Sequence, residues 1–250
     1  MNDTAHATRV PAAAVAAVLA AQDLRVGYGG KPVLNGVSIA LRQNEVLCVI
    51  GHNGAGKSTL MRTLFGLVKP LSGRVEVDGR ILPSHDPRSL ARHGIAMMPE
   101  GRGIFPGLTV AEIWSLGLWS ADIPKEERAE RIEWVLSVLP PVRNFYTKRA
   151  GLLSGGQQQM VSIGRSLLSR PRCLIMDEPS IGLAPKLFQD LLQPIRALQR
   201  EKGMSILLVE QNVREALKVS DRVVVMKAGQ FILEAKPDEL SDNARLMELY

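Results

Sequence analysis

The residues best suited to chemistry in this chain form a run that could hold the phosphates of a nucleoside triphosphate. The pattern G-x-x-x-x-G-K-[ST] is filled by Gly51-His52-Asn53-Gly54-Ala55-Gly56-Lys57-Ser58-Thr59. In such a loop the glycines let successive backbone N–H groups surround the phosphates, the lysine reaches the terminal two, and the serine hydroxyl ligates Mg²⁺. We therefore assign nucleotide binding to the whole run, with Lys57 also acting in catalysis and Ser58 as a metal ligand.

The segments on either side of this loop support the assignment. Residues 46–50 form a short apolar run typical of a buried strand, and residues 57–67 have the pattern of a helix. The positive N-terminal end of that helix would face the phosphates. A chance glycine-rich turn is the competing interpretation, and the loop by itself does not separate a kinase, a GTPase, a transporter ATPase or a helicase.

Two further motifs follow in the second half of the chain. Leu153-Ser154-Gly155-Gly156-Gln157 precedes a helical pattern, and the apolar run 173–176 is followed by Asp177 and Glu178. Together and in this order the motifs resemble the ATP-binding cassette proteins, whose signature is LSGGQ and whose second acidic motif is four apolar residues followed by Asp-Glu. The resemblance extends from about residue 21 to the C-terminus.

This resemblance implies roles for the residues that match. Asp177 would hold the Mg²⁺ shell, directly or through water, and Glu178 would orient and deprotonate the water that attacks the terminal phosphate of ATP. The alternative is that the two carboxylates only end a strand. Tyr28 matches the family's aromatic residue that stacks on adenine, although a tyrosine beside two glycines can also be a packed turn residue.

The signature motif implies a second subunit. The backbone N–H groups of Ser154, Gly155, Gly156 and Gln157 open a helix and can bind phosphate. In the family this motif completes the nucleotide site of the opposing cassette, so the implied working unit is a homo- or heterodimer of ATPase subunits. Arg165, farther along the same helix, is expected to be structural or salt-bridging rather than catalytic.

Three positions depart from the family pattern. Glu100 stands where a glutamine usually ligates Mg²⁺ or water, and a carboxylate can still serve as a metal ligand. Gln211 replaces the histidine that contacts the terminal phosphate; it can donate a neutral hydrogen bond but has no proton to switch. Ala184 stands where the loop between subunits usually ends in aspartate.

Several longer runs narrow the resemblance to one kind of ABC protein. Residues 99–102, 105–110, 179–185 and 209–212 resemble the ATPase subunit of high-affinity branched-chain amino acid importers. That likeness implies two transmembrane permease subunits and, indirectly, a solute-binding protein. Three alternatives remain open: an importer ATPase for urea or short amides, a soluble ABC ATPase acting on ribosomes or in DNA repair, and a nucleotide-binding regulator without turnover.

Composition limits where such a protein works. The formal net charge is +6, but basic and aromatic residues are not interleaved, so we expect no nucleic-acid partner. No apolar run reaches the roughly 18 to 20 residues that a membrane helix requires; the nearest candidate, the Ala-rich stretch 11–21, is too short. Because this stretch is weakly hydrophobic and has only Arg9 before it, we do not expect a signal peptide. We expect a peripheral protein on the cytoplasmic face of the inner or plasma membrane. Cys48 and Cys173 lie in apolar runs and are expected to be buried packing residues.

The pattern of apolar runs predicts an α/β fold. Strands are expected at 46–50, 74–77, 173–176, 206–209 and 222–226, and helices at 57–67, 157–169, 185–200 and 213–219. With the resemblance, this indicates a P-loop NTPase (RecA-like) core with a mixed sheet, formed by residues 19–84 and 160–250. Strands are expected to be absent between about residues 84 and 153, and residues 85–159 are expected to be an inserted all-helical subdomain with the signature at its end. Residues 1–18 are expected to be a flexible extension and 240–250 a terminal helix, and Asn44 is expected to adopt a left-handed turn.

Overall fold

The computed structural model describes residues 17–101 and 103–240. The strands in this part of the chain are β1 (Ala17–Tyr28), β2 (Lys31–Arg42), β3 (Val46–Ile50), β4 (Ser72–Val77), β5 (Ile95–Met98), β6 (Cys173–Asp177), β7 (Ser205–Glu210), β8 (Arg222–Lys227) and β9 (Gln230–Ala235). The helices are α1 (Lys57–Leu64), α2 (Pro87–Arg92), α3 (Val110–Ser120), α4 (Lys125–Val138), α5 (Gly155–Leu167), α6 (Pro185–Lys202) and α7 (Val213–Val219). Short 3₁₀ turns η1 (Pro140–Phe145), η2 (Ala150–Leu152) and η3 (Pro237–Leu240) complete the list.

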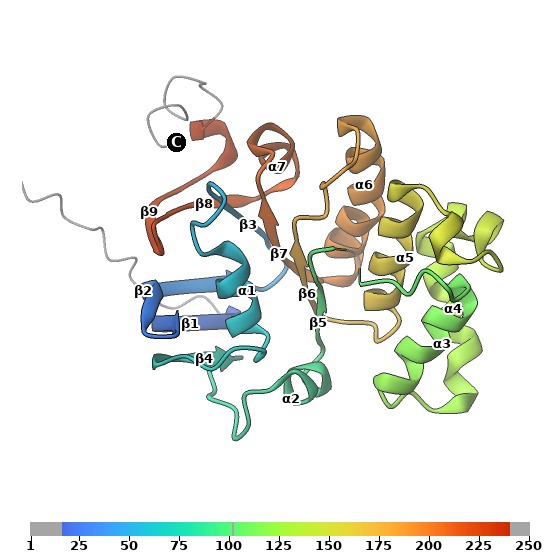
Figure 1. Ribbon diagram of the computed structural model, residues 1–250, viewed down its shortest axis with the longest axis horizontal. Coiled ribbons are helices and arrows are strands. Elements are labelled where there is room, and N and C mark those ends of the chain that lie inside the picture. Colours follow the sequence, from blue (N-terminus) through green and yellow to red (C-terminus); the bar gives the residue numbers. More distant parts are fainter. Residues whose placement is uncertain (1–16, 102, 241–250) are drawn as a thin grey trace, which may run out of the picture.

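These strands form two sheets. The larger sheet has the order β5-β6-β7-β3-β8-β9, in which neighbouring strands are parallel except for the antiparallel pair β8 and β9. A smaller antiparallel sheet has the order β2-β1-β4 and lies beside α1 (Figure 1). The predicted mixed sheet is therefore confirmed, with strands and helices alternating along the chain as expected for an α/β fold.

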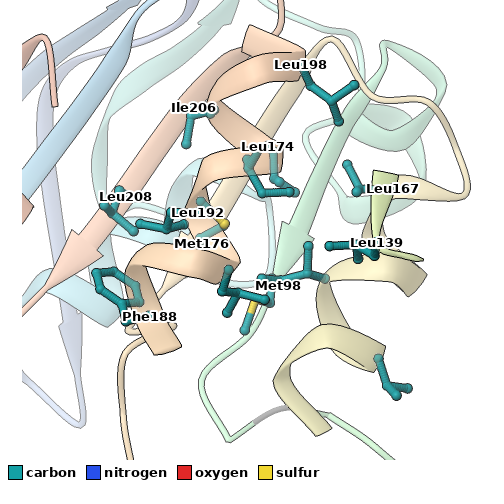
Figure 2. Close-up of a cluster of buried hydrophobic side chains, with 14 of the residues drawn as sticks. Met98, Leu139, Leu167, Leu174, Met176, Phe188, Leu192, Leu198, Ile206 and Leu208 are labelled. Carbon is teal, nitrogen blue, oxygen red and sulfur yellow. The ribbon is translucent and has the colours of Figure 1, made fainter. Parts of the chain in front are cut away.

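The central sheet is buried on both faces, and the alternation of its side chains divides the core in two. Cys48 and Ile50 point into a cluster with residues of α3, α5 and α6, part of which is drawn in Figure 2. Leu47 and Val49 point the other way, into a cluster with α1 and the smaller sheet. Burial on both faces explains why these strands read as continuous apolar runs in the sequence.

The two cysteines have the expected packing role. Cys48 and Cys173 lie in β3 and β6, are fully buried and are not joined in a disulfide. Burial raises the pKa of the Cys173 thiol to about 12 and also raises that of Cys48. Both therefore remain neutral thiols that act as small hydrophobic side chains.

The prediction that strands are absent between residues 84 and 153 is wrong. The four-residue strand β5 lies in this range and pairs in parallel with β6, from Ile95 beside Cys173 to Met98 beside Met176. It therefore belongs to the central sheet, although the range 85–159 was assigned to a helical insertion. A strand this short, directly after Gly94, is too brief to show a periodic pattern.

The chain ends also differ from expectation. Strand β1 begins at Ala17, which pairs with Arg42 of β2, so residues 17 and 18 belong to a strand rather than to an extension. Residues 1–16 of the expected extension and residues 241–250 of the expected terminal helix lie outside the described residues. Among those that are described, no helix is both long and apolar enough to cross a membrane.

Left-handed residues end helix α1 and form the turn before β3. Helix α1 ends at Leu64 rather than near residue 67, because Gly66 adopts a left-handed conformation with a φ of 74°. Asn44 has a φ of 56°, so the predicted left-handed turn before β3 is confirmed. Residues of β7 and α6 stabilise this turn: Asn44 N donates to Ser205 Oγ at 2.9 Å, and the Asn44 carbonyl accepts from Gln199 Nε2 at 2.8 Å.

The segment containing α3 packs on α5 through one tryptophan. Trp114 is fully buried, and its Nε1 donates to the carbonyl of Val161 on α5 at 3.0 Å. Its ring meets Tyr146 edge to face, with 5.6 Å between ring centroids. Gly164 provides the space for the ring, since a Cβ there would lie 2.3 Å from Trp114 Cζ2.

We expect Gly164→Ala to destabilise the protein by about 1–3 kcal/mol, because the added methyl group overlaps the Trp114 ring. The effect opposes helix propensity, which favours alanine over glycine by roughly 1 kcal/mol. Urea denaturation of the two single variants and the double variant with Trp114→Phe gives the coupling between these positions. Strictly additive losses would show that the Trp114 contact is not the cause.

Candidate functional site

The predicted site residues come together where parallel strands of the central sheet end. Ile50, the last residue of β3, pairs with Glu210 of β7, and Asp177 at the end of β6 pairs with Val209. Because the strands are parallel, their carboxyl ends meet at one edge of the sheet, which is where α/β proteins bind ligands. The chain after β3 forms the phosphate loop, so this loop lies beside the acidic residues that follow β6.

The phosphate loop has the backbone conformation that its glycines allow. Gly54 and Gly56 have φ values of 80° and 107°, a region that L-residues rarely adopt. At Gly51 a Cβ would lie 2.3 Å from the carbonyl oxygen of Met226, so a larger residue cannot fit there. The loop, Gly51 to Ala55, lines a hollow together with residues 225–228, and α1 begins directly after it.

Lys57 lies inside this loop rather than in solvent. Its Nζ donates to the carbonyl oxygens of Gly51 at 2.8 Å and His52 at 3.0 Å. The same nitrogen is 3.5 Å from Glu178 Oε1, and both side chains are almost fully buried. The structure therefore brings the predicted phosphate-binding cation into contact with the predicted catalytic carboxylate.

Asp177 and Ser58 form the part of the site suited to a metal. Ser58 Oγ donates to Asp177 Oδ1 at 3.4 Å, whereas the buried Asp177 Oδ2 has no hydrogen-bond partner among the described residues. Burial raises the pKa of Asp177 to about 6, and the nearby charges of Glu100 and Glu178 add to this effect. A bound cation would compensate for that crowding of negative charge.

These oxygen donors fit Mg²⁺. The ion prefers one or two carboxylates together with waters and substrate phosphates, rather than a cage made only of protein ligands. Consistent with this, the described residues contain no cluster of three or more His, Cys, Asp or Glu side chains arranged to hold a metal. Glu100 follows β5, the strand next to β6, and is exposed at the same edge of the sheet.

Glu178 has an unusual backbone conformation. Its φ is 51°, in the left-handed region that costs a residue with a side chain about 1–2 kcal/mol. The Glu178 N–H donates to the carbonyl of Val209 at 3.0 Å, and Gln211 Nε2 donates to Glu178 Oε2 at 2.5 Å. Of the predicted catalytic residues, Glu178 is thus in direct contact with both Lys57 and Gln211.

Tyr28 lies at the end of β1, before a glycine turn. Tyr28 ends β1, is about half exposed, and precedes a turn at Gly29 and Gly30, both of which have positive φ. The strand after this turn approaches the loop, since a Cβ at Gly56 would lie 2.9 Å from Leu34 Cδ2. The adenine-stacking role of Tyr28 stays a prediction.

The signature motif begins α5 on the other face of the sheet from α1. Ser154 is the N-cap: its Oγ accepts from Gln157 N at 3.4 Å, and Gln157 Oε1 accepts from Ser154 N at 3.0 Å. This reciprocal capping box fixes the start of the helix. Residues of α5 pack in the core cluster shared with α6, whereas those of α1 pack in the cluster beneath the smaller sheet.

Arg165 binds a backbone carbonyl, and Ala184 lies at the start of α6. Arg165 Nη1 donates to the carbonyl of Gly103 at 2.5 Å, and burial lowers the pKa of this arginine. Its described contacts include no carboxylate within ion-pair distance, so it ties α5 to the loop after Glu100 through a backbone oxygen. Ala184 is the N-cap of α6 and supplies no side-chain hydrogen bond there.

Sequence reasoning missed one polar group at the site. Glu210, at the end of β7, is fully buried; its Oε1 accepts from Ser180 N at 2.9 Å, and its Oε2 lies 2.5 Å from Ser180 Oγ. Burial raises the pKa of Glu210 to about 7. The only indication in the sequence was a carboxylate that directly follows the apolar run 206–209.

Comparison with known proteins identifies this architecture. The model of the ABC transporter family matches residues 34–181. The chain is 39% identical over 223 residues to the high-affinity branched-chain amino acid transport ATP-binding protein BraG of Pseudomonas aeruginosa, covering 89% of this chain and 94% of the relative. A crystal structure of a nucleotide-free ATP-binding cassette from an ABC transporter superposes with a TM-score of 0.83 and 31% identity, over 94% of this chain and 98% of that one.

A further solved structure bears on assembly. The dimeric structure of MJ0796, a bacterial ABC transporter cassette, superposes with a TM-score of 0.77 and 25% identity, over 88% of this chain and 98% of that one. The fold and the site define an ATP-binding cassette, a class that dimerises. The chain belongs to the ABC transporter family, and it is an ATP-hydrolysing transport ATPase.

The raised pKa of Glu210 predicts pH-dependent stability. In the unfolded chain this carboxyl ionises near its ordinary pKa of 4.5, whereas in the fold it remains protonated up to about pH 7. Its contribution to stability is therefore full at low pH and is lost as pH rises from 4.5 through 7. Relative to Glu210→Gln, which cannot ionise, the wild type should lose on the order of 3 kcal/mol between pH 5 and pH 8.

Chemical denaturation at several pH values measures this difference. Glu126→Gln, at an exposed position of α4, is the control and should differ from the wild type by a constant amount. A pH-independent difference between the wild type and Glu210→Gln would contradict the raised pKa.

Proposed function

We propose that this chain is the ATPase subunit of an importer for branched-chain amino acids or related small amino acids and amides. The observation that carries the catalytic part is the direct contact of Glu178 with both Lys57 and Gln211 at the sheet edge, beside Asp177. The transported solute is inferred from the likeness to BraG, whose name specifies branched-chain amino acids. The runs 179–185 and 209–212 support the same inference.

In the proposed reaction, ATP binds with its phosphates against the loop of residues 51–59. The N–H groups of the loop and the start of α1 contact the phosphates, and Lys57 exchanges its bonds with loop carbonyls for the terminal phosphates. The hollow lined by Gly51 to Ala55 provides this position. Adenine would stack on Tyr28, whose ring is accessible at the end of β1.

Glu178 is the proposed general base. Its carboxylate accepts a proton from the water that attacks the terminal phosphorus, and the Gln211 amide donates to the other carboxylate oxygen and so orients it. The Gln211 amide does not ionise at neutral pH, so it orients the base without taking the proton. Mg²⁺ would be held by Ser58 and Asp177, with Glu100 as a further ligand, and would neutralise negative charge on the phosphates.

The position of the signature supports an assembly in pairs. Ser154 to Gln157 begin a helix that packs on the face of the sheet opposite α1, away from the chain's own phosphate loop. We propose that this helix start binds the terminal phosphate of ATP held by a partner cassette, identical or different. Each nucleotide would then lie between the loop of one subunit and the signature of the other.

The proposed membrane partners are two permease subunits, to which a solute-binding protein delivers the substrate. The chain would act as a peripheral protein on the cytoplasmic face of the membrane. We propose that the permease subunits contact this chain at the helical segment 85–159 and at the loop after Glu100. In that loop the Phe105 side chain is about half exposed. An exposed aromatic residue at this position is suited to a protein partner.

We expect Glu178→Gln to lower kcat for ATP hydrolysis at least 100-fold, because the amide cannot accept the proton of the attacking water. ATP affinity should change little, since Lys57 and the loop are intact. Phosphate release measures the rate, and calorimetry measures binding. Glu133→Gln, at an exposed carboxylate paired with Arg143, is the matched control. Full turnover in Glu178→Gln would exclude Glu178 as the base.

Purification of the tagged chain from its native host in mild detergent should recover a second cassette and two permease subunits. ATP hydrolysis should be faster in this complex than in the isolated chain, and leucine or valine uptake by reconstituted vesicles should require ATP. If only urea or short amides stimulate ATP hydrolysis by the complex, the transported solute is one of these compounds and not a branched-chain amino acid. Recovery with ribosomes or DNA in place of permeases would favour a soluble ABC ATPase instead.

A further inference from the structure

The segment that follows Glu178 is held by buried side chains from two different elements. We propose that Glu210 and Gln159 are positioning residues, which hold Pro179 and Ser180 and thereby keep the Glu178 carboxylate in place for ATP hydrolysis. This inference rests on the proposed function of Glu178 as the base. Neither position belongs to the phosphate loop, the signature or the acidic motif.

Glu210 holds the segment from the end of β7. Both of its carboxyl oxygens face Ser180: Oε1 accepts from the backbone N–H at 2.9 Å, and Oε2 lies 2.5 Å from the hydroxyl. The residues on either side of Glu210 hold Glu178 itself, since the Val209 carbonyl accepts from Glu178 N and Gln211 donates to its carboxylate. Three successive residues of one strand end therefore bind the segment that follows β6.

Gln159 holds the same segment from α5. Its Nε2 donates to the carbonyl of Pro179 at 2.7 Å, and the side chain is 2% exposed. The other amide atom, Oε1, is buried without a hydrogen-bond partner among the described residues. A buried acceptor without a partner opposes stability, so stability alone does not account for a glutamine at this position. The helix that carries Gln159 begins at Gly155 within the signature, and the signature ends two residues before Gln159.

The backbone of Glu178 explains why this support matters. Its left-handed φ of 51° persists only where surrounding contacts favour it. The bonds at Pro179 and Ser180 fix the residues directly after it, and Ile181 N donates to the Glu178 carbonyl at 3.2 Å. A shift of about 1 Å in a catalytic group can lower a rate by roughly 100-fold. Loss of either support should therefore reduce turnover while nucleotide binding is unaffected.

Gln159→Met separates positioning from stability. The methionine has similar volume, loses the bond to Pro179 and also removes the unpaired Oε1. We expect the melting temperature to stay within a few degrees, kcat of the permease complex to fall about 10-fold, and KM for ATP to change less than twofold. Ser162→Ala, at a buried serine on the same helix whose hydroxyl has no described hydrogen-bond partner, should leave all three unchanged.

A second set of variants tests the contact from β7. Glu210→Gln retains an acceptor for Ser180 N and should keep kcat within about threefold, whereas Glu210→Met removes both acceptors and should lower kcat about 10-fold. Ser180→Ala removes only the hydroxyl contact and should give an intermediate loss. Rescue by the conservative variant distinguishes hydrogen bonding from volume, and Ser180→Ala and Gln159→Met test the inference even if Glu210→Met does not fold.

Glu178→Gln is measured in the same assay. If it is inactive while Gln159→Met and Ser180→Ala both turn over at the wild-type rate, the positioning roles are overturned and the base assignment stands. If Glu178→Gln remains fully active, both proposals are overturned. A fall in kcat accompanied by a similar fold-loss of ATP affinity, or by a drop of many degrees in melting temperature, would also overturn the inference. Either result would indicate general disruption of the site.

Discussion

The parallel pairing of β3, β6 and β7 is the constraint on which the site depends. The register places Ile50 beside Glu210 and Asp177 beside Val209, so the phosphate loop, the acidic pair and Gln211 leave the sheet at one edge. These strands are held by apolar side chains on both faces, and a shift of one residue would exchange those faces. The hydrophobic core thereby determines the distances between polar groups far apart in the sequence.

The site formed at this edge of the sheet has more carboxylates than cationic side chains. Lys57 meets Glu178, but Asp177 faces Ser58 and is near two further carboxylates, whose charge together with burial raises the pKa of Asp177 to about 6. Such an arrangement is unfavourable for the protein alone and favourable once a divalent cation is present. The same excess of negative charge explains why the loop must contribute N–H groups, a helix end and a lysine to bind phosphates.

Sequence reasoning was most accurate where the chemistry restricts residue types. The buried strands that precede the phosphate loop and Glu178 were predicted correctly, because each is a short apolar run directly before a motif of fixed spacing. The strands β1 and β2 were not predicted, since glycines at 27 and 36 and several register shifts interrupt their alternation. The strand β5 was missed because four residues carry no usable period.

The contacts of Gln159 and Glu210 could not have been read from the sequence. Both residues act on a segment 20 to 30 positions away, and their partners are mainly backbone atoms, whose positions depend on how α5 and β7 pack. A glutamine in a helix and a carboxylate after a strand are each common on protein surfaces. Only their burial distinguishes them here.

The conformation of Glu178 depends both on its sequence motif and on contacts that only the fold provides. A motif specifies that a glutamate follows Asp177, but it does not specify that the backbone of this glutamate is left-handed or that its carboxylate contacts both Lys57 and Gln211. That geometry is less favourable by itself than extended backbone, so it must be maintained by neighbouring contacts. The hydrogen bonds made by Val209, Glu210, Gln211 and Gln159 converge on the three residues 178–180, which include this left-handed position. The position of the catalytic carboxylate is in this sense a property of the packing between β6, β7 and α5, and not of the acidic motif alone.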